Sequence, residues 1–377
     1  MNFDFLDIIL ILIIVQCSIF LASLLQKSHR KRANLFLSLF FTSQMFVCAN
    51  IFIFHHQTQT ASAIPHLFFI GTPFYFLIGP SLWLYTKSAA FSNFRFELSQ
   101  LKHVVLFFAA LLYFIASFHF HSSDEKRLLI QNDVIRSFSY LVIFNVILFT
   151  QIAAYIIGSI SVIRRYRELI KQEYASVYGL NLSWLKLFLY GYLAAWFTSV
   201  LYTIYYLVYA DALLPLPIAN NLVFFIFFNI IFYKGLIQPE LFSGVEEKPK
   251  YLTSRLNKDD ADKYASLLLT LMEKEKPYLN PTITLPDLSK HLSIAPRYLS
   301  QVINEYYHKN FFDFINQYRI QEAQKQLCNP ENDDKTVLQI LYDVGFNSKS
   351  SFNTAFKRHA GVTPRQFREA QTQKSSG

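Results

Sequence analysis

The sequence predicts an all-α protein: a bundle of seven transmembrane helices followed by a cytoplasmic domain with two helix-turn-helix units. Two observations lead to this fold class. Hydrophobic residues make up 53% of the 377 residues and charged residues only 16%, and the charged residues are sparse before the C-terminal third. The later part of the chain places apolar residues at helical spacing among polar ones. An apolar part followed by a polar part indicates two solvents, lipid and water.

Seven charge-free runs are long enough to cross a bilayer. Each has about 17 or more residues, the length that a helix needs to cross a ~30 Å hydrocarbon core, and none alternates as a membrane strand does. No Asp, Glu, Lys or Arg lies inside these runs, and ion-coupled carriers usually need such groups there. We expect spans near residues 8–25, 34–54, 67–86, 104–120, 137–163, 187–209 and 213–233.

Lys and Arg residues between the expected spans indicate the orientation. The N-terminal segment and the second, fourth and sixth loops carry only Lys126, Arg127 and Arg136. The first, third and fifth loops carry Lys27, Arg30, Lys31, Arg32, Lys87, Arg95, Lys102, Arg164, Arg165, Arg167, Lys171 and Lys186. Because cytoplasmic loops are rich in Lys and Arg, the N-terminus is expected outside and everything after the seventh span in the cytoplasm.

Polar residues within the expected spans have two interpretations. They form hydrogen bonds between helices, or some of them line a ligand cavity that opens to the outside. The residues concerned are Gln44, Asn50, Asn145, Gln151, Asn220, Asn221 and Asn229. We select Asn145 and Gln151 as candidate signal-sensing residues.

Five histidines fall near the outer ends of the expected spans: His55, His56, His66, His119 and His121. Together with Asp124 and Glu125 they are candidates for a cluster that senses pH or binds a metal. The alternative is that they are ordinary interfacial histidines. Their spacing matches no metal motif, and the three cysteines, Cys17, Cys48 and Cys328, show none either. We therefore expect no metal and no cofactor.

The chain divides into four segments. Residues 1–237 form the membrane part, and residues 238–257 form a linker with Pro239, Gly244 and Pro249 as helix breakers. Residues 258–281 are an amphipathic connecting helix, with its apolar positions at spacings of three and four: Ala261, Tyr264, Leu268, Leu271 and Met272. Residues 282–372 form the last domain.

Two similar units make up this last domain. In the first, near 284–306, Thr284 and Asp287 form a predicted capping box; in the second, near 336–359, Thr336 and Gln339 repeat it. The first helices of the two units lie 52 residues apart and the second helices 53 apart, so the second turn, at Gly345, is one residue longer. Each unit has the pattern of a helix-turn-helix, and a long helical pattern with inward apolar residues joins them.

The outward faces of the two second helices carry hydrogen-bond donors and no acid. Such side chains can read base edges in the major groove, and flanking Lys and Arg can contact phosphates. The candidate base-contacting residues are Arg297, Ser300, Gln301, Asn304, Lys349, Ser350, Asn353 and Thr354. The candidate phosphate-contacting residues are Lys357, Arg358, Arg365 and Arg368. A merely solvated polar face is the alternative for one unit alone, but the match between two units argues against it.

Residues 282–370 resemble the AraC/XylS family of bacterial transcription regulators. The resemblance rests on "APRYLSQVINEYYHKNFFDFINQYRIQEAQKQL" and "ILYDVGFNSKSSFNTAFKRHAGVTPRQFR". It implies that two helix-turn-helix units, joined by a long helix, enter successive major grooves, and that the base-contacting positions include Arg297, Ser300, Gln301, Lys349, Ser350, Asn353 and Thr354. Ala295 departs from the pattern, because Ser often caps the recognition helix there. Seven spans stand where family members usually carry a soluble sensor, as in a membrane-bound subgroup.

These features together predict a membrane-bound, sequence-specific transcriptional regulator in the inner membrane of a bacterium. The alternative is a transporter or a receptor whose cytoplasmic tail regulates transcription as a secondary role. No Walker A loop and no Ser-His-Asp or Cys-His arrangement occurs, so we expect no enzymatic activity. The expected partners are double-stranded DNA, the lipid bilayer, RNA polymerase, a second copy of the chain and an unknown small ligand.

Overall fold

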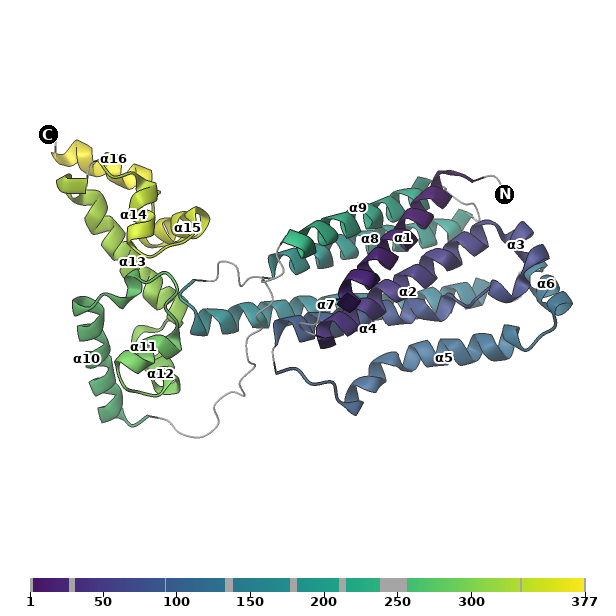
Figure 1. The fold of residues 1–377 in the computed structure, drawn as a ribbon, viewed down its shortest axis with the longest axis horizontal. Coiled ribbons are helices and arrows are strands. Elements are labelled where there is room, and N and C mark those ends of the chain that lie inside the picture. Colours follow the sequence, from purple (N-terminus) through teal and green to yellow (C-terminus); the bar gives the residue numbers. More distant parts are fainter. Residues whose placement is uncertain are drawn as a thin grey trace. The chain divides into compact units, whose positions relative to one another are not determined.

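The computed structural model describes residues 3–26, 31–91, 93–132, 138–176, 182–209, 215–237, 256–332 and 334–375. This part of the chain is helical and contains no strand beyond one isolated bridge between Tyr174 and Thr284, so the all-α fold class is confirmed (Figure 1). The chain forms two compact units. The first comprises Met1–Arg164 and Leu182–Glu246, and the second comprises Arg165–Asn181 and Glu247–Gly377.

The first unit is built from long apolar helices. They are α1 (Phe5–Gln26), α2 (Lys31–His55), α4 (Tyr75–Ala90), α5 (Val105–Phe114), the greater part of α7 (Phe138–Glu173), α8 (Ser183–Tyr209) and α9 (Pro215–Ile237). Two short helices, α3 (Gln57–Ala63) and α6 (Ser123–Gln131), lie side by side at one end of the unit (Figure 1). Helix α2 packs between α1 and α4, and α9 packs against both α1 and α8.

Six helical stretches are long and apolar enough to cross a membrane: Phe5–Leu24, Ala33–His55, Pro65–Ala90, Leu98–His119, Val142–Glu173 and Leu185–Tyr209. They coincide with the first six expected spans. Helix α9 occupies the seventh position, but its described apolar stretch, Pro217–Ile226, is shorter, so the seventh span stays a prediction. Helix α1 begins at Phe5, before the expected first span, and therefore also includes Asp7, which is fully buried.

Several sequence expectations fall on residues outside those described. They concern most of the linker expected at 238–257, together with Lys27, Arg30 and Arg136, three of the residues used to orient the spans.

The second unit contains the two expected helix-turn-helix pairs. Its helices are α10 (Lys258–Lys274), α11 (Leu285–His291), α12 (Pro296–Tyr307), α13 (Phe311–Cys328), α14 (Val337–Asp343), α15 (Lys349–Ala360) and α16 (Pro364–Ser375). The helices α11 and α14 start 52 residues apart, and α12 and α15 start 53 apart. The longer second turn is therefore confirmed.

Local capping determines where these helices begin. Both predicted capping boxes are present, with Thr284 and Asp287 at α11 and with Thr336 and Gln339 at α14. The hydroxyl of Ser348 accepts a hydrogen bond at the start of α15. Helix α12 has no such side-chain bond, because Ala295 occupies its N-cap, as the sequence indicated. These short-range bonds satisfy backbone N–H groups that the helix itself leaves unpaired.

Helix α13 joins the two helix-turn-helix pairs by contributing to both of their cores. Phe311, Phe314 and Ile315 belong to the cluster that contains α11, α12 and the inner face of α10. Ile320, Ala323 and Leu327 belong to the cluster formed with α14 and α15. Two cores on one continuous helix restrict the movement of one pair relative to the other. The expectation that α10 is amphipathic is also confirmed, since Ala261, Leu268, Leu271 and Met272 are buried.

The segment after α7 is part of the second unit. The Ala175 side chain is buried in the same cluster as α11 and α12, and its backbone N–H donates a hydrogen bond to the carbonyl of Ile283 at 3.2 Å. The Ser176 hydroxyl donates to Asn347 at 2.9 Å. The sequence places these residues between two expected spans, yet they pack against the C-terminal domain. Ala175 and Ser176 are called the strap below.

Candidate DNA interface and ligand cavity

All eight candidate base-contacting residues lie on α12 or α15 at solvent-accessible positions. Arg297 and Asn304 are exposed on α12, and Ser300 and Gln301 are half-buried there. Lys349, Ser350, Asn353 and Thr354 are all exposed on α15. The opposite faces hold Leu299, Val302 and Ile303 in α12 and Phe352, Ala355 and Phe356 in α15, all buried. Each second helix therefore presents one polar face, with donors available for a groove of DNA.

Residues of the α12 face have partners within the domain, and Asn304 donates to the carbonyl of Ser300 at 2.8 Å. The Gln301 side chain accepts a hydrogen bond from the backbone N–H of Leu256 at 3.3 Å and donates to Glu305 at 3.1 Å. The Arg297 guanidinium lies over the ring of Tyr298, 4.6 Å from its centroid, and donates to its hydroxyl. A base contact by either residue requires these partners to be exchanged. The α12 face is thus less open than the α15 face.

The candidate phosphate contacts are also engaged. Arg358 forms an ion pair with Asp313 of α13 at 2.5 Å, and Arg365 pairs with Glu369 at 2.8 Å. Arg368 donates to the backbone carbonyl of Lys335 at 2.8 Å. Arg358 and Arg368 therefore tie α15 and α16 to the rest of the domain. Lys357, exposed on the face of α15, is the better placed of the four for a phosphate.

Arg319, which the sequence analysis did not select, is the largest fully buried side chain of the described chain. Its Nε donates to the carbonyl of Tyr278 and its second terminal nitrogen to that of Asn280, both at 2.7 Å, and its first terminal nitrogen donates to the carbonyl of Ala175 at 3.4 Å. Burial lowers the pKa of Arg319 to about 10, so the group stays protonated at neutral pH. The sequence signal that could have identified Arg319 as buried is its position on the apolar face of α13, four residues after Ile315.

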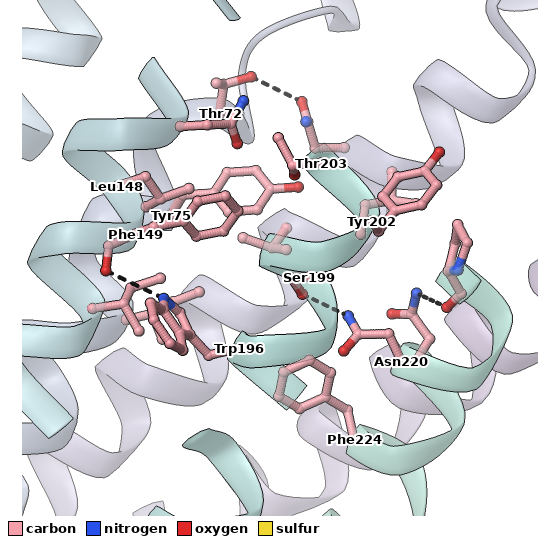
Figure 2. A pocket seen from close by; sticks show the side chains of 18 of the residues that line it. Thr72, Tyr75, Leu148, Phe149, Trp196, Ser199, Tyr202, Thr203, Asn220 and Phe224 are labelled. Atoms are coloured by element: carbon pink, nitrogen blue, oxygen red, sulfur yellow. Dashed lines mark hydrogen bonds between the residues drawn. The ribbon is translucent and has the colours of Figure 1, made fainter. Parts of the chain in front are cut away.

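The first unit encloses a cavity of about 500 Å³, a size suited to a small organic molecule. Figure 2 shows Tyr75, Phe149, Trp196, Tyr202 and Phe224 around it, contributed by α4, α7, α8 and α9. Among the described residues, no Asp, Glu, Lys or Arg lines the cavity, and His55 is the one imidazole that does. An aromatic lining without full charges favours an uncharged, mainly apolar ligand.

Polar side chains enter this lining at a few points. Asn220 donates to Ser199 at 3.1 Å and accepts from Thr198 at 2.9 Å, joining α9 to α8 (Figure 2). The indole of Trp196 donates to the carbonyl of Phe149 at 3.2 Å. The side-chain oxygen of Gln44 is buried in the lining without a hydrogen-bond partner. A ligand with a hydrogen-bond donor could therefore be oriented inside an otherwise apolar space.

Both interpretations of the polar span residues find support. Gln44, Asn50, Asn145, Asn220 and Asn221 line the cavity. Gln151 instead donates to the carbonyl of Phe76 at 3.0 Å and so joins α7 to α4, whereas Asn229 bonds within α9. Of the two candidate sensing residues, Asn145 thus lies at the cavity and Gln151 serves a hydrogen bond between helices.

The five histidines fall into two groups. His55 and His56 pair with Asp4 and Asp7 at the N-terminal end of α1. In the second group, the amine of Lys126 lies 2.8 Å from Nδ1 of His66 and donates to the carbonyl of His119 at 3.0 Å. The Nδ1 atom of His121 lies 3.5 Å from Oε2 of Glu125. His55 and His56 therefore pair with Asp4 and Asp7, whereas the sequence analysis suggested Asp124 and Glu125.

The geometry of the second unit defines a double helix-turn-helix domain, and the comparisons with known proteins agree. The family model for a helix-turn-helix domain matches residues 288–370. Regulatory protein PocR of Salmonella typhimurium is 27% identical over 92 residues, which cover 24% of this chain and 29% of PocR. The melibiose operon regulatory protein of Escherichia coli is 23% identical over 123 residues, which cover 32% of this chain and 40% of that protein.

A solved structure is also similar. The C-terminal domain of AraT, a response regulator from Geobacillus stearothermophilus, is 25% identical, with coverage of 31% of this chain and 88% of that one and a TM-score of 0.25. The relatives are transcriptional regulators, and the resemblance to the AraC family holds for the C-terminal domain. The matched segments span less than half of PocR and of the melibiose regulator.

Proposed function

We propose that this chain is a membrane-bound, sequence-specific regulator of transcription that responds to a small molecule held in the cavity of its first unit. One observation carries the proposal: two helix-turn-helix pairs with matching exposed faces follow, on the same polypeptide, six helices apolar enough to span a membrane. The first feature is suited to DNA and the second to lipid. The proposed location is the inner membrane of a bacterium, with the C-terminal domain in the cytoplasm.

DNA is read through α12 and α15 in successive major grooves. Helix α13 has 18 residues and is therefore about 27 Å long, of the same order as the ~34 Å repeat of B-DNA. Since α13 shares a core with each pair, the spacing between the two recognition helices is set by the domain itself. On the exposed α15 face, Asn353 contacts a base edge and Lys357 contacts a phosphate.

The response to ligand runs through α7. This helix contributes Asn145, Leu148 and Phe149 to the cavity, and the strap that follows it, around Ala175, is buried in the core of the DNA-binding domain. A ligand that binds one arrangement of the cavity better than another shifts the equilibrium between them. That shift reaches the strap along a continuous helix, without a need to pass through the expected linker at 238–257.

A transporter or a receptor with a regulatory tail is the second candidate. The uncharged cavity weighs against an ion-coupled carrier, which usually needs ionisable groups there. A tail that binds only protein would not need the donor-rich faces of α12 and α15. Genome-wide mapping of DNA bound by the full-length protein separates these possibilities, because a tail that binds only protein would enrich no sequence.

Paired substitutions on α15 then test how DNA is read. Asn353→Ala should cost about 1–3 kcal/mol on the preferred site with little loss on random DNA, whereas Lys357→Ala should weaken both and reduce the salt slope by about 1. Binding of the full-length protein to both DNAs, measured at several salt concentrations, provides the comparison. If the two variants behave alike on both DNAs, the assignment of base and phosphate contacts is wrong.

A further inference from the structure

Two carboxylates and two imidazoles converge where the start of α1 meets the end of α2. The Nε2 atom of His56 lies 3.0 Å from both carboxylate oxygens of Asp7, and the Nε2 atom of His55 lies 2.7 Å from Oδ2 of Asp4. One ligand atom from each of Asp7, His55 and His56 lies within 4.8 Å of the others. Three side chains thus bring potential metal ligands together, and Asp4 adjoins them through His55.

Backbone groups orient both carboxylates. The N–H of Asp4 donates to Oδ2 of Asp7 at 2.9 Å, and the N–H of Asp7 donates to Oδ1 of Asp4 at 3.1 Å. Outer hydrogen bonds of this kind hold the ligands of metal sites in position.

Charge balance favours a cation at this place. The Asp7 side chain is fully buried and His56 is 8% exposed, and burial of a carboxylate is costly unless its charge is compensated. Within the described residues, the ion pairs of Asp4 and Asp7 involve only His55 and His56. One divalent cation would balance the charge of both carboxylates.

We propose that Asp7, His55 and His56 bind a divalent first-row transition metal ion such as Zn²⁺, with Asp4 completing the set. Mixed imidazole and carboxylate ligands suit zinc, copper, iron or nickel better than magnesium or calcium. Zinc bonds of ~2.0–2.1 Å at tetrahedral angles place ligand atoms roughly 3.3 Å apart. The measured spacings of 2.7 and 3.0 Å are near that value, so small side-chain rotations close the site.

The ion would sit at the edge of the cavity. His55 and Leu6, the neighbour of Asp7, both line it. A metal bound by α1 and α2 together would hold these two helices against each other at that edge. The site is independent of the proposed role in transcription, because its ligands all belong to the first unit.

Metal binding can be measured directly on the full-length protein, purified with a tag free of histidine, treated with EDTA and placed in lipid nanodiscs. Titration with Zn²⁺ alone should show one ion per chain, and Co²⁺ should give the visible absorption of a site with nitrogen and oxygen ligands. His56→Gln, His55→Gln and Asp7→Asn should each weaken zinc binding by at least roughly 10–100-fold. His66→Gln and His121→Gln, from the other histidine group, are matched controls and should bind as the parent does.

The proposal is overturned if the parent binds no more Zn²⁺ than empty nanodiscs do, or if His55→Gln and His56→Gln bind as tightly as the parent. Loss of binding in His66→Gln would equally overturn it, because the ion would then belong to the Lys126 group. Asp7 is buried, so its variant also needs a check of folding by circular dichroism. The His55 side chain is 23% exposed, and its replacement keeps the test valid even if Asp7→Asn fails to fold.

Discussion

Replacing Arg319 with methionine should loosen the DNA-binding domain and release the strap that follows α7. The substitution keeps a long apolar stem but removes every donor of the guanidinium. The carbonyl of Tyr278 then has no hydrogen-bond partner among the described residues, whereas the carbonyls of Asn280 and Ala175 each lose one donor and keep another, from Ile283 and Asn316. Because these carbonyls belong to two segments far apart in the sequence, the loss affects the whole core around α11, α12 and α13.

The size of the effect follows from the two short contacts. A buried carbonyl left without a partner, as at Tyr278, costs about 1–3 kcal/mol, and a lost hydrogen bond to a charged group, as at Asn280, costs about 1.5–3 kcal/mol, so the two together account for roughly 2.5–6 kcal/mol. Removal of a buried charge offsets part of this loss, since burial has lowered the pKa of Arg319 to about 10. We therefore expect a net loss of about 2 kcal/mol, which is a large fraction of the stability of a typical domain.

Hydrogen exchange of the full-length protein, followed by mass spectrometry, measures this loss locally. At 1.4 kcal/mol for each tenfold change, about 2 kcal/mol corresponds to roughly 30-fold faster exchange in α11–α13 and at the N–H of Ala175, which bonds to Ile283 in the parent. Lys325→Met, exposed on the same helix, is the matched control and should change little. Equal exchange in Arg319→Met and in the parent would refute the structural role given to this side chain.

Three further predictions follow from other parts of the chain. Gly361→Ala should cost only the ~1–2 kcal/mol of a left-handed conformation, because nothing lies near its added Cβ. Gly345→Ala should lower thermal stability more, because its Cβ would also lie 2.6 Å from the carbonyl of Leu279; equal losses would contradict this. Burial, Arg358 and Lys309 lower the pKa of His359, so the folded domain binds a proton less readily than the unfolded chain. Its stability should therefore fall as pH drops below about 6.5, and His359→Gln should reduce that slope in thermal unfolding. Ser199→Phe should fill the cavity and abolish the transcriptional response while DNA binding by the full-length protein persists; a retained response would place the ligand elsewhere.

The helix-turn-helix pairs could be predicted from the sequence because their signals are local. Thr284 and Asp287 are three residues apart, and so are Thr336 and Gln339, so each capping box depends only on the conformation of one turn. The faces of α12 and α15 follow from helical periodicity within a dozen residues. The division of α13 between two cores was visible in the same way, from the spacing of its apolar residues.

The first unit was predictable in composition but not in arrangement. Length and hydropathy identified six stretches that the structure bears out, because a continuous apolar run needs no knowledge of its neighbours. They did not distinguish Asn145, which lines the cavity, from Gln151, which bonds to the carbonyl of Phe76. Which side of a membrane helix faces a cavity depends on the helices packed against it.

The sequence by itself determined where the helices begin, which of them are apolar and which faces of α12 and α15 are polar. Only the tertiary structure brought Asp7 to His56, 49 residues away, and Arg319 to Ala175, 144 residues away. Neither pair has a spacing that any local pattern encodes. Each forms because packed helices place a buried polar group beside a distant partner that helps to satisfy it, and burial makes such partners necessary.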